Sequence, residues 1–269
     1  MTTHDKLLRL QETIRGCGTL AVAFSGGVDS CFLLHLAHEA LGERALALTV
    51  DSVFIPREEI VEAEAFCRER GIRQQILRMD PLSIPGVAAN PPDRCYLCKS
   101  TIFSLMRQEA EKAGCAVLAD GSNADDVGDY RPGMRALREL GIQSPLMEAG
   151  LGKSEIRALS REMGLPCWDK PSAACLASRV AYGETLTVEK LRAVEKAEEL
   201  LHTLGIRQCR VRVHGKTARI EVPPADFASI LPEENRRRIV SVLKECGFSY
   251  VSLDLEGFRS GGMNEILKK

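Results

Sequence analysis

Six consecutive residues, Ser25-Gly26-Gly27-Val28-Asp29-Ser30, have the types and spacing to hold a phosphate group. They lie between an apolar run at 20–24 and an apolar segment at 31–41, which predicts a strand, a glycine-rich turn and a helix. The first N–H groups of a helix favour an anion, and glycines let the backbone approach it closely. Ser25 and Ser30 add hydroxyl donors, and Asp29 adds a carboxylate that can hold Mg²⁺. The segment therefore predicts a phosphate site.

This loop has no lysine at the position that a Walker-type sequence, GxxxxGK[ST], requires. It resembles the PP-loop of the ATP pyrophosphatases, enzymes that split ATP between its α and β phosphates and transfer AMP to an oxygen of the substrate. The resemblance implies ATP and Mg²⁺ as cofactors, with contacts from Ser25, Gly26, Gly27, Val28, Asp29 and Ser30. The alternative is an ordinary serine-glycine turn after a strand.

Length and charge limit the classes of function. The chain has 269 residues, more than one average domain, and its 36 basic and 37 acidic side chains give a net charge of −1. This balance gives no general reason to expect a nucleic-acid surface and favours a small anionic substrate. The N-terminal residues are charged, and no stretch approaches the length of a membrane span. We expect a cytoplasmic protein with neither nucleic acid nor membrane as partner.

Residues 1–170 alternate between short apolar runs and helical patterns. This order predicts an α/β fold, a parallel sheet with helices on both faces. Strands are expected at 20–24, 45–50, 75–79 and 116–119. Ligands of such sheets bind outside the carboxyl ends of the strands, where the strand order reverses. The polar residues that follow the fourth strand should therefore lie near the phosphate loop.

Two further polar segments are candidates for that site. Asp120-Gly121-Ser122-Asn123-Ala124-Asp125-Asp126 follows the fourth strand, and Lys153 begins a predicted helix. The PP-loop resemblance implies nucleotide contacts for Gly121 and Asp126, although an Asn/Asp-rich turn that caps the next helix accounts for the same residue types. A lysine in the first turn is unfavourable for the helix dipole unless an anion is bound. The resemblance implies that Lys153 binds ATP phosphates, and the alternative is a solvated side chain.

The chain contains ten cysteines, which in a cytoplasmic protein do not indicate a disulfide framework. Most lie among apolar neighbours or at element ends and are interpreted as small hydrophobic side chains, namely Cys17, Cys31, Cys67, Cys115, Cys167, Cys209 and Cys246. Cys95 and Cys98 form a CxxC pair before a predicted helix at about 99–112. Cys175 lies in a segment of small residues that also carries Lys170 and Arg179, cations that can hold an anion.

The CxxC pair has three interpretations. Zinc would require further ligands, and the five histidines show no suitable spacing. A redox pair would require a thioredoxin-like context, which a PP-loop does not supply. A 4Fe-4S cluster would require further thiolates, for which Cys175 is the candidate. The remaining alternative is an incidental pair and a buried Cys175.

Together these motifs closely resemble the LarE family over nearly the whole chain. The ordered set comprises residues 25–30, Arg94-Cys95-Tyr96-Leu97-Cys98-Lys99, residues 121–131, residues 153–157 and Cys175-Leu176-Ala177-Ser178-Arg179. The family consists of ATP-dependent sulfur transferases of nickel-pincer nucleotide biosynthesis. The resemblance implies that the chain adenylylates the carboxylates of pyridinium-3,5-biscarboxylic acid mononucleotide and replaces an oxygen with sulfur.

The family has two sulfur sources. Members with a lone cysteine at the position of Cys175 give up its sulfur and retain dehydroalanine. Members that also have the CxxC pair resemble cluster enzymes, in which three thiolates hold 4Fe-4S and the open iron carries an extra sulfide. The presence of Cys95, Cys98 and Cys175 implies the second type, supplied by sulfide or by a sulfur-donor protein.

The pattern changes after Gly183. We expect a PP-loop domain at 1–183 and a smaller α+β domain for substrate binding and oligomerisation at 184–269. A helix is expected at 187–204, a hairpin at 209–222, a second helix at 236–246 and a final strand at 250–255.

Period-2 alternation places Arg210 and Arg212 on one face of the predicted hairpin. The family resemblance suggests that they bind the substrate's phosphate near a subunit contact, and the alternative is a solvated sheet face. Arg179 is a third candidate for substrate binding. The resemblance also implies a homo-oligomer, with a hexameric ring of trimers as one form.

Other functions would share parts of this pattern. A tRNA-thiolating PP-loop enzyme also uses ATP and cysteines, but the chain has no basic bias or evident RNA-binding appendage. A glutamine-dependent amidotransferase would share residues 25–30 but gives the three cysteines no role. A nucleotide-binding or redox-sensing module without catalysis is the third alternative.

Overall fold

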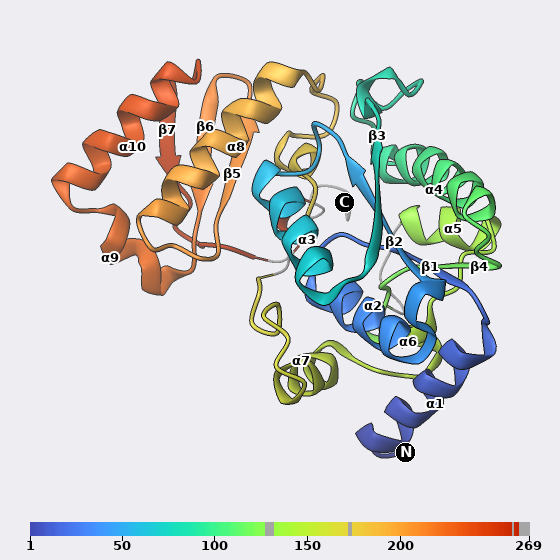
Figure 1. Cartoon of the computed structure of the whole chain (residues 1–269). Coiled ribbons are helices and arrows are strands. Elements are labelled where there is room, and N and C mark those ends of the chain that lie inside the picture. The colour runs from blue at the N-terminus through green and yellow to red at the C-terminus, as the bar shows by residue number, and fades with distance from the viewer. Residues whose placement is uncertain (127–131, 172–173, 260, 264–269) are drawn as a thin grey trace. The chain divides into compact units, whose positions relative to one another are not determined.

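The computed structural model describes residues 1–126, 132–171, 174–259 and 261–263 (Figure 1). These residues form two compact units. The first unit comprises residues 1–79 and 95–172, and the second comprises residues 80–94 and 173–269. Each unit has its own sheet.

The first unit contains a parallel sheet in the order β3-β2-β1-β4. Its strands are β1 (Leu20–Ala23), β2 (Ala45–Asp51), β3 (Arg73–Arg78) and β4 (Val117–Ala119). The α/β prediction is therefore confirmed, although β3 begins two residues before the predicted start of 75. The chain adds β2 and β3 on one side of β1 and β4 on the other, so the strand order reverses between β1 and β4.

Both faces of this sheet are buried, because successive side chains of each strand point to opposite faces. Leu20 and Val22 pack into one apolar cluster, whereas Ala21 packs into the other. The first face is covered by α1 (Thr3–Gly16), α2 (Val28–Leu41), α3 (Arg57–Arg70), α6 (Pro145–Glu148) and α7 (Lys153–Glu162) (Figure 1). The second is covered by α4 (Arg94–Lys112) and α5 (Pro132–Glu139).

Helix α1 was not predicted, although the sequence carries its signals. Thr2 and Asp5 form a capping box, in which each side chain accepts from the other residue's backbone N–H. Leu7, Leu10 and Ile14 follow at helical spacing and are buried against the sheet's helices. The charged residues between them obscured this periodicity.

Helix α4 corrects the predicted start of the helix after the CxxC pair. The helix begins at Arg94 rather than near residue 99, so Cys95 and Cys98 lie within its first turns. Residues three apart on a helix share a face. The two thiols therefore project from one side of α4.

The second unit contains a three-stranded sheet in the order β5-β6-β7. Its strands are β5 (Arg210–His214), β6 (Thr217–Glu221) and β7 (Tyr250–Leu253), and its helices are α8 (Val188–Thr203), α9 (Phe227–Ile230) and α10 (Glu233–Glu245). The predicted hairpin is confirmed, with β5 antiparallel to β6 and Gly215 at a φ of 57° in the turn. Strand β7 ends at Leu253, two residues before the predicted end, and α10 begins three residues before its predicted start.

Within the described ranges, no helix is long and apolar enough to cross a membrane.

The carboxylate of Glu155 joins helices α1 and α7. It accepts from the backbone N–H of Gly152 at 3.0 Å, from the Thr3 hydroxyl at 2.9 Å and from Lys6 Nζ at 2.7 Å. The backbone hydrogen bond from Gly152 is the largest cause that lowers the pKa of Glu155 below its usual 4.5, followed by Lys6. This carboxylate therefore stabilises the fold in its charged form.

We expect Glu155→Gln to lower the free energy of unfolding by about 1 kcal/mol at pH 7. Because the pKa is lowered in the folded state, the contribution is present above pH 4.5 and is lost as the pH falls through the folded value. The gap between wild type and variant should therefore close in acid, as measured by urea denaturation at several pH values. The exposed Glu12 of α1 provides a control, because Glu12→Gln should leave stability unchanged at every pH. A gap that persists unchanged below pH 4 would contradict the assignment.

Candidate active site

The glycine-rich segment between β1 and α2 forms a loop held by its own serines. The hydroxyls of Ser25 and Ser30 lie 3.2 Å apart, and Ser30 Oγ accepts from the Ser25 N–H at 3.3 Å and donates to the Gly27 carbonyl at 3.0 Å. Gly26 has a φ of 73°, a conformation that favours glycine. Gly27 is the N-cap residue of α2 and has no side chain to cap it, while its own N–H donates to Ser25 Oγ at 3.5 Å. The first N–H groups of α2 are thus presented to an anion, as predicted for a phosphate loop.

Gly121 brings the loop after β4 against the start of α2. A Cβ atom at position 121 would lie 3.1 Å from Ser30 N and 3.3 Å from Ser30 Cα. Both neighbours are backbone atoms, which cannot move aside as a flexible side chain can. The two loops at the reversal of strand order therefore meet, and a side chain at position 121 would force them apart by a few tenths of an ångström.

Lys153 completes this cluster. Its Nζ forms an ion pair with Asp29 Oδ2, and its backbone N–H donates to Asp125 Oδ2 at 2.8 Å. Asp29 Oδ1 is buried and has no hydrogen-bond partner among the described residues. The cluster thus combines a cation with a carboxylate oxygen that is available to a metal ion. The first can bind a phosphate and the second is a donor of the kind that Mg²⁺ prefers.

Asp126 and Asp125 have different positions in the turn at η3 (Ala124–Asp126). Asp126 Oδ2 accepts from the Asn123 N–H at 3.0 Å, the local contact of a turn-capping residue. Asp125 is the residue that reaches the start of α7. Sequence reasoning proposed Asp126 as a nucleotide contact and gave Asp125 no separate role, because two adjacent aspartates carry the same signal until the turn directs them differently.

Lys170 holds the phosphate loop through a backbone carbonyl. Its Nζ donates to the Gly26 carbonyl at 3.3 Å, to Glu59 at 2.7 Å and to Glu62 at 2.5 Å. Burial by itself would lower the pKa of Lys170, but the hydrogen bonds and charges of the two glutamates outweigh it and raise the pKa. Lys170 is therefore charged and held in a fixed position, from which it supports the phosphate loop.

All ten cysteines carry thiols, and those interpreted as hydrophobic are mostly buried. Burial raises the pKa of Cys67 and of Cys209 to about 12, which suppresses the thiolate. Cys31 and Cys167 belong to the core cluster beneath α2 and share a hydrogen bond, which raises the pKa of Cys31 and lowers that of Cys167. The burial of these four cysteines agrees with their interpretation as small hydrophobic side chains.

The CxxC pair lies on α4, with Cys98 buried and Cys95 half-buried. Tyr96 lies between them in sequence, and its hydroxyl donates to Glu139 of α5 at 2.6 Å. The guanidinium of Arg135 lies 3.7 Å from the centroid of the Tyr96 ring. Helix α5 thus fixes the first turn of α4. Within the described ranges, no group of three or more His, Cys, Asp or Glu side chains is arranged to hold a metal ion.

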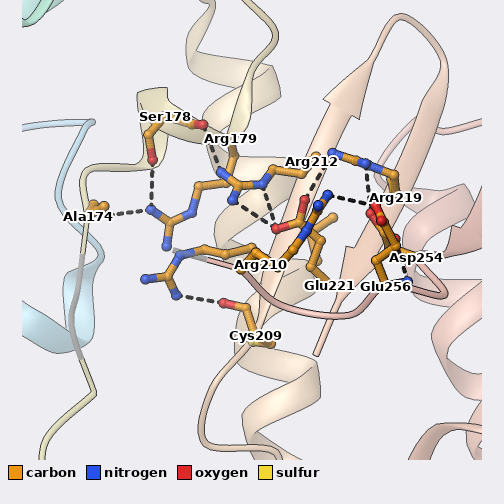
Figure 2. A network of polar contacts seen from close by, with 12 residues as sticks. Ala174, Ser178, Arg179, Cys209, Arg210, Arg212, Arg219, Glu221, Asp254 and Glu256 are labelled. Carbon is orange, nitrogen blue, oxygen red and sulfur yellow. Dashed lines mark hydrogen bonds and ion pairs between the residues drawn. The ribbon is translucent and has the colours of Figure 1, made fainter. Parts of the chain in front are cut away.

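Cys175 belongs to the second unit, at the start of the 3₁₀ turn η4 (Leu176–Arg179). The buried Arg179 donates to the Ala174 carbonyl (Figure 2). It also donates to the Cys175 carbonyl at 3.1 Å and forms an ion pair with Glu198 at 2.8 Å. Burial alone would lower the pKa of Arg179, and the Glu198 carboxylate outweighs this and raises it. Arg179 therefore holds the loop of Cys175 in place.

The arginines of the hairpin differ in environment (Figure 2). Arg212 donates twice to Glu221 Oε2, at 3.0 and 2.8 Å, and also to the Ser178 carbonyl. Arg219 joins Glu221 to Asp254. Only 5% of Arg212 and 3% of Glu221 is exposed, so the alternative of a solvated sheet face is wrong for these residues.

Arg210 is a half-buried cation of the hairpin. Its Nη1 donates to the Cys209 carbonyl at 2.6 Å, and its guanidinium lies 5.4 Å from the centroid of the Phe258 ring. Burial, followed by the charge of Arg179, lowers the pKa of Arg210 to about 10. A desolvated cation of this kind gains more from an anion than an exposed arginine does.

Comparison with known proteins gives a consistent result. The NAD synthase family model matches residues 4–86. An uncharacterized protein of Synechocystis is 40% identical over 266 residues, covering 99% of each chain. The pyridinium-3,5-bisthiocarboxylic acid mononucleotide synthase of Lactiplantibacillus plantarum is 38% identical over 269 residues, covering 100% of this chain and 97% of its own. The glutamine-hydrolyzing GMP synthase of Lactobacillus delbrueckii is 30% identical over 223 residues, covering 74% of this chain and 43% of its own.

We expect Gly121→Ala to weaken the binding of ATP by about tenfold, because the new methyl group would push the phosphate loop away from the β4 loop. Isothermal titration calorimetry with ATP and Mg²⁺ measures this loss. Gly16→Ala is a matched control, since nothing lies within 4 Å of a Cβ at position 16. Unchanged affinity in the Gly121 variant would contradict the proposed closeness of the two loops.

Proposed function

The chain belongs to the LarE family, and on this premise we propose that it is an ATP-dependent sulfur transferase that acts on pyridinium-3,5-biscarboxylic acid mononucleotide. In this proposal each carboxylate is first adenylylated with release of pyrophosphate and then converted to a thiocarboxylate with release of AMP. The observation that carries the activating half is the cluster of the phosphate loop, Gly121 and Lys153 at the reversal of strand order. The sulfur-transferring half depends on the three cysteines.

The activating half needs a leaving group, because a carboxylate is a poor electrophile. A carboxylate oxygen attacks the α-phosphorus of ATP, and the bond to pyrophosphate breaks. The N–H groups at the start of α2 and the ammonium of Lys153 would stabilise the negative charge that develops on the departing pyrophosphate. The attacking oxygen is already anionic, so no general base is required.

Mg²⁺ fits the donor atoms of the site formed by the phosphate loop, Gly121 and Lys153. The buried oxygen of Asp29 that lacks a hydrogen bond to any described residue would be its protein ligand. When bound, the ion would neutralise charge on the phosphates. Lys153 holds the other oxygen of Asp29, so the carboxylate is oriented before the nucleotide arrives.

For the second half we propose that Cys95, Cys98 and Cys175 are ligands of a 4Fe-4S cluster. Their thiols have the chemistry that such a cluster requires, and Cys95 and Cys98 share one face of α4. When bound, the cluster would supply sulfide from the iron that no protein thiolate occupies. Arg179 holds the backbone of Cys175, and α5 holds the turn of Cys95 and Cys98 through Tyr96. Both arrangements would keep the thiol positions constant during turnover.

The substrate also carries a phosphate, for which we propose Arg210 as the principal contact. Arg212 and Arg179 are held by Glu221 and Glu198, so they would add positive charge to the site from fixed positions. We further propose that residues 184–269 form the substrate-binding and oligomerisation domain of a cytoplasmic homo-oligomer. Sulfide or a sulfur-donor protein would replenish the sulfur.

We expect Lys153→Met to lower substrate-dependent pyrophosphate release by about 100-fold or more, because charge on the leaving group would lose its cation. The assay combines anaerobically reconstituted protein, ATP, Mg²⁺, sulfide and the dicarboxylate nucleotide. Pyrophosphate is measured enzymatically, and mass spectrometry detects the thiocarboxylate.

Lys190→Met is the matched control, because Lys190 forms a partly exposed ion pair with Glu184 in the second unit. It should retain wild-type rates. Pyrophosphate release that does not depend on the pyridinium nucleotide, or wild-type protein that forms no thiocarboxylate, would refute the proposed function.

We expect Cys95→Ala, Cys98→Ala and Cys175→Ala each to lose the stoichiometric iron that wild-type protein gains on anaerobic reconstitution. Each should also make no more than about one sulfur transfer per chain, because two thiolates do not hold the cluster. Iron analysis and electron paramagnetic resonance measure the first effect, and product mass spectrometry measures the second.

Cys246→Ala is the control, since Cys246 is a half-buried thiol with no assigned role. Wild-type protein that binds no iron and acquires dehydroalanine at position 175 after turnover would instead identify Cys175 as a sacrificial sulfur donor. Full activity in any of the three variants would rule out the cluster assignment.

A further inference from the structure

Asn90 occupies an unusual position in the second unit. It is completely buried, and its φ of 55° lies in the left-handed region, the one non-glycine case among the described residues. Asparagine tolerates this conformation better than most residues, but it is seldom buried without a reason. The conformation directs both its backbone and its side chain toward the segment that follows Cys175.

Every polar group of the Asn90 side chain is used. Its Nδ2 donates to the carbonyls of Val180 at 3.1 Å and Ala181 at 2.8 Å, while its backbone carbonyl accepts from the Gly183 N–H at 3.0 Å. Its Oδ1 accepts from Arg94 Nη1. One side chain thus closes a loop whose ends are 90 residues apart in sequence.

Arg94 links the hydrogen bonds of Asn90 to the loop that begins at Cys175. It is 2% exposed, and its Nη1 also donates to the Ala177 carbonyl at 3.0 Å. Ala177 lies two residues after Cys175, and Arg94 directly precedes Cys95 in sequence. A charged side chain this deeply buried is costly unless its hydrogen bonds are made. Arg94 makes them to the loop that begins at Cys175 and to Asn90.

We propose that Asn90 and Arg94 are positioning residues that hold the Cys175 loop for sulfur transfer. These hydrogen bonds lead to the Cys175 loop rather than to the phosphate loop, Gly121 or Lys153, so the ATP-dependent step should proceed without them. The inference rests on the proposed function, because it assigns these residues to its second step. The proposal predicts that variants of Asn90 and Arg94 lose sulfur transfer but keep adenylylation. General destabilisation would instead reduce both half-reactions.

Two variants test the proposal. Asn90→Gly keeps the left-handed backbone accessible but removes three side-chain hydrogen bonds. Arg94→Lys keeps the charge but not the guanidinium that reaches both Asn90 and Ala177. Asn235→Ala is the control, since Asn235 donates to the carbonyl of Ser229, away from this loop.

The assay compares, in one reaction, the first-turnover burst of pyrophosphate with the formation of thiocarboxylate. We expect both variants to lose at least about tenfold in thiocarboxylate, because small misplacements of a reacting group are costly, while the pyrophosphate burst changes by less than about twofold. Iron content after reconstitution should fall in parallel with thiocarboxylate. Thermal denaturation establishes that each variant is folded, and Arg94→Lys alone decides the outcome if Asn90→Gly does not fold.

The results separate this inference from the function on which it rests. Wild-type protein that forms no thiocarboxylate overturns both. Wild-type activity together with variants that keep full thiocarboxylate formation, or that lose both half-reactions equally, overturns the positioning role and leaves the proposed function standing.

Discussion

The first unit depends on the reversal of strand order between β1 and β4, because this reversal leaves room for two loops at one edge of the sheet. Gly121 and Ser30 meet there so closely that a Cβ atom at position 121 would press against backbone atoms of Ser30. The same edge receives Lys153 from α7, and Lys170 supports the loop through the Gly26 carbonyl. Each of these residues comes from a different part of the chain, so the sheet must form before the site exists.

The second unit is organised by buried charge rather than by a glycine contact. Arg179 and Arg212 are nearly inaccessible to solvent, and they form ion pairs with the buried Glu198 and Glu221, respectively. Each also donates to the backbone, Arg179 to the Ala174 carbonyl and Arg212 to the Ser178 carbonyl (Figure 2). Such pairs contribute little net stability, since desolvation opposes the attraction, but losing one partner is strongly destabilising. These ion pairs therefore fix the positions of their side chains more than they add to stability. Together with Asn90 and Arg94, they restrain the backbone on both sides of Cys175.

Three elements show how far the sequence could be interpreted. The strand, the Gly-Gly turn and the apolar helix around residues 25–30 were predicted correctly, because each is a local pattern. Helix α1 was not predicted, although its capping box is visible in the sequence. The start of α4 was predicted about five residues after its observed start at Arg94. The alternation of β5 was recognised, yet its charged face was given a solvated alternative that burial of Arg212 and Glu221 rules out.

The sequence by itself determined the α/β class, the phosphate loop and the set of motifs that resembles the LarE family, since these depend on residue types at short spacing. Only the tertiary structure decided that Asp125 contacts the start of α7, and that Arg179 holds a loop. The tertiary structure alone also revealed that Asn90 and Arg94 hydrogen-bond to the segment that follows Cys175. Asp125 and Lys153 are 28 residues apart and Asn90 and Val180 are 90 apart, so these contacts leave no local trace in the sequence. A hydrogen bond depends on where the folded backbone brings two groups together.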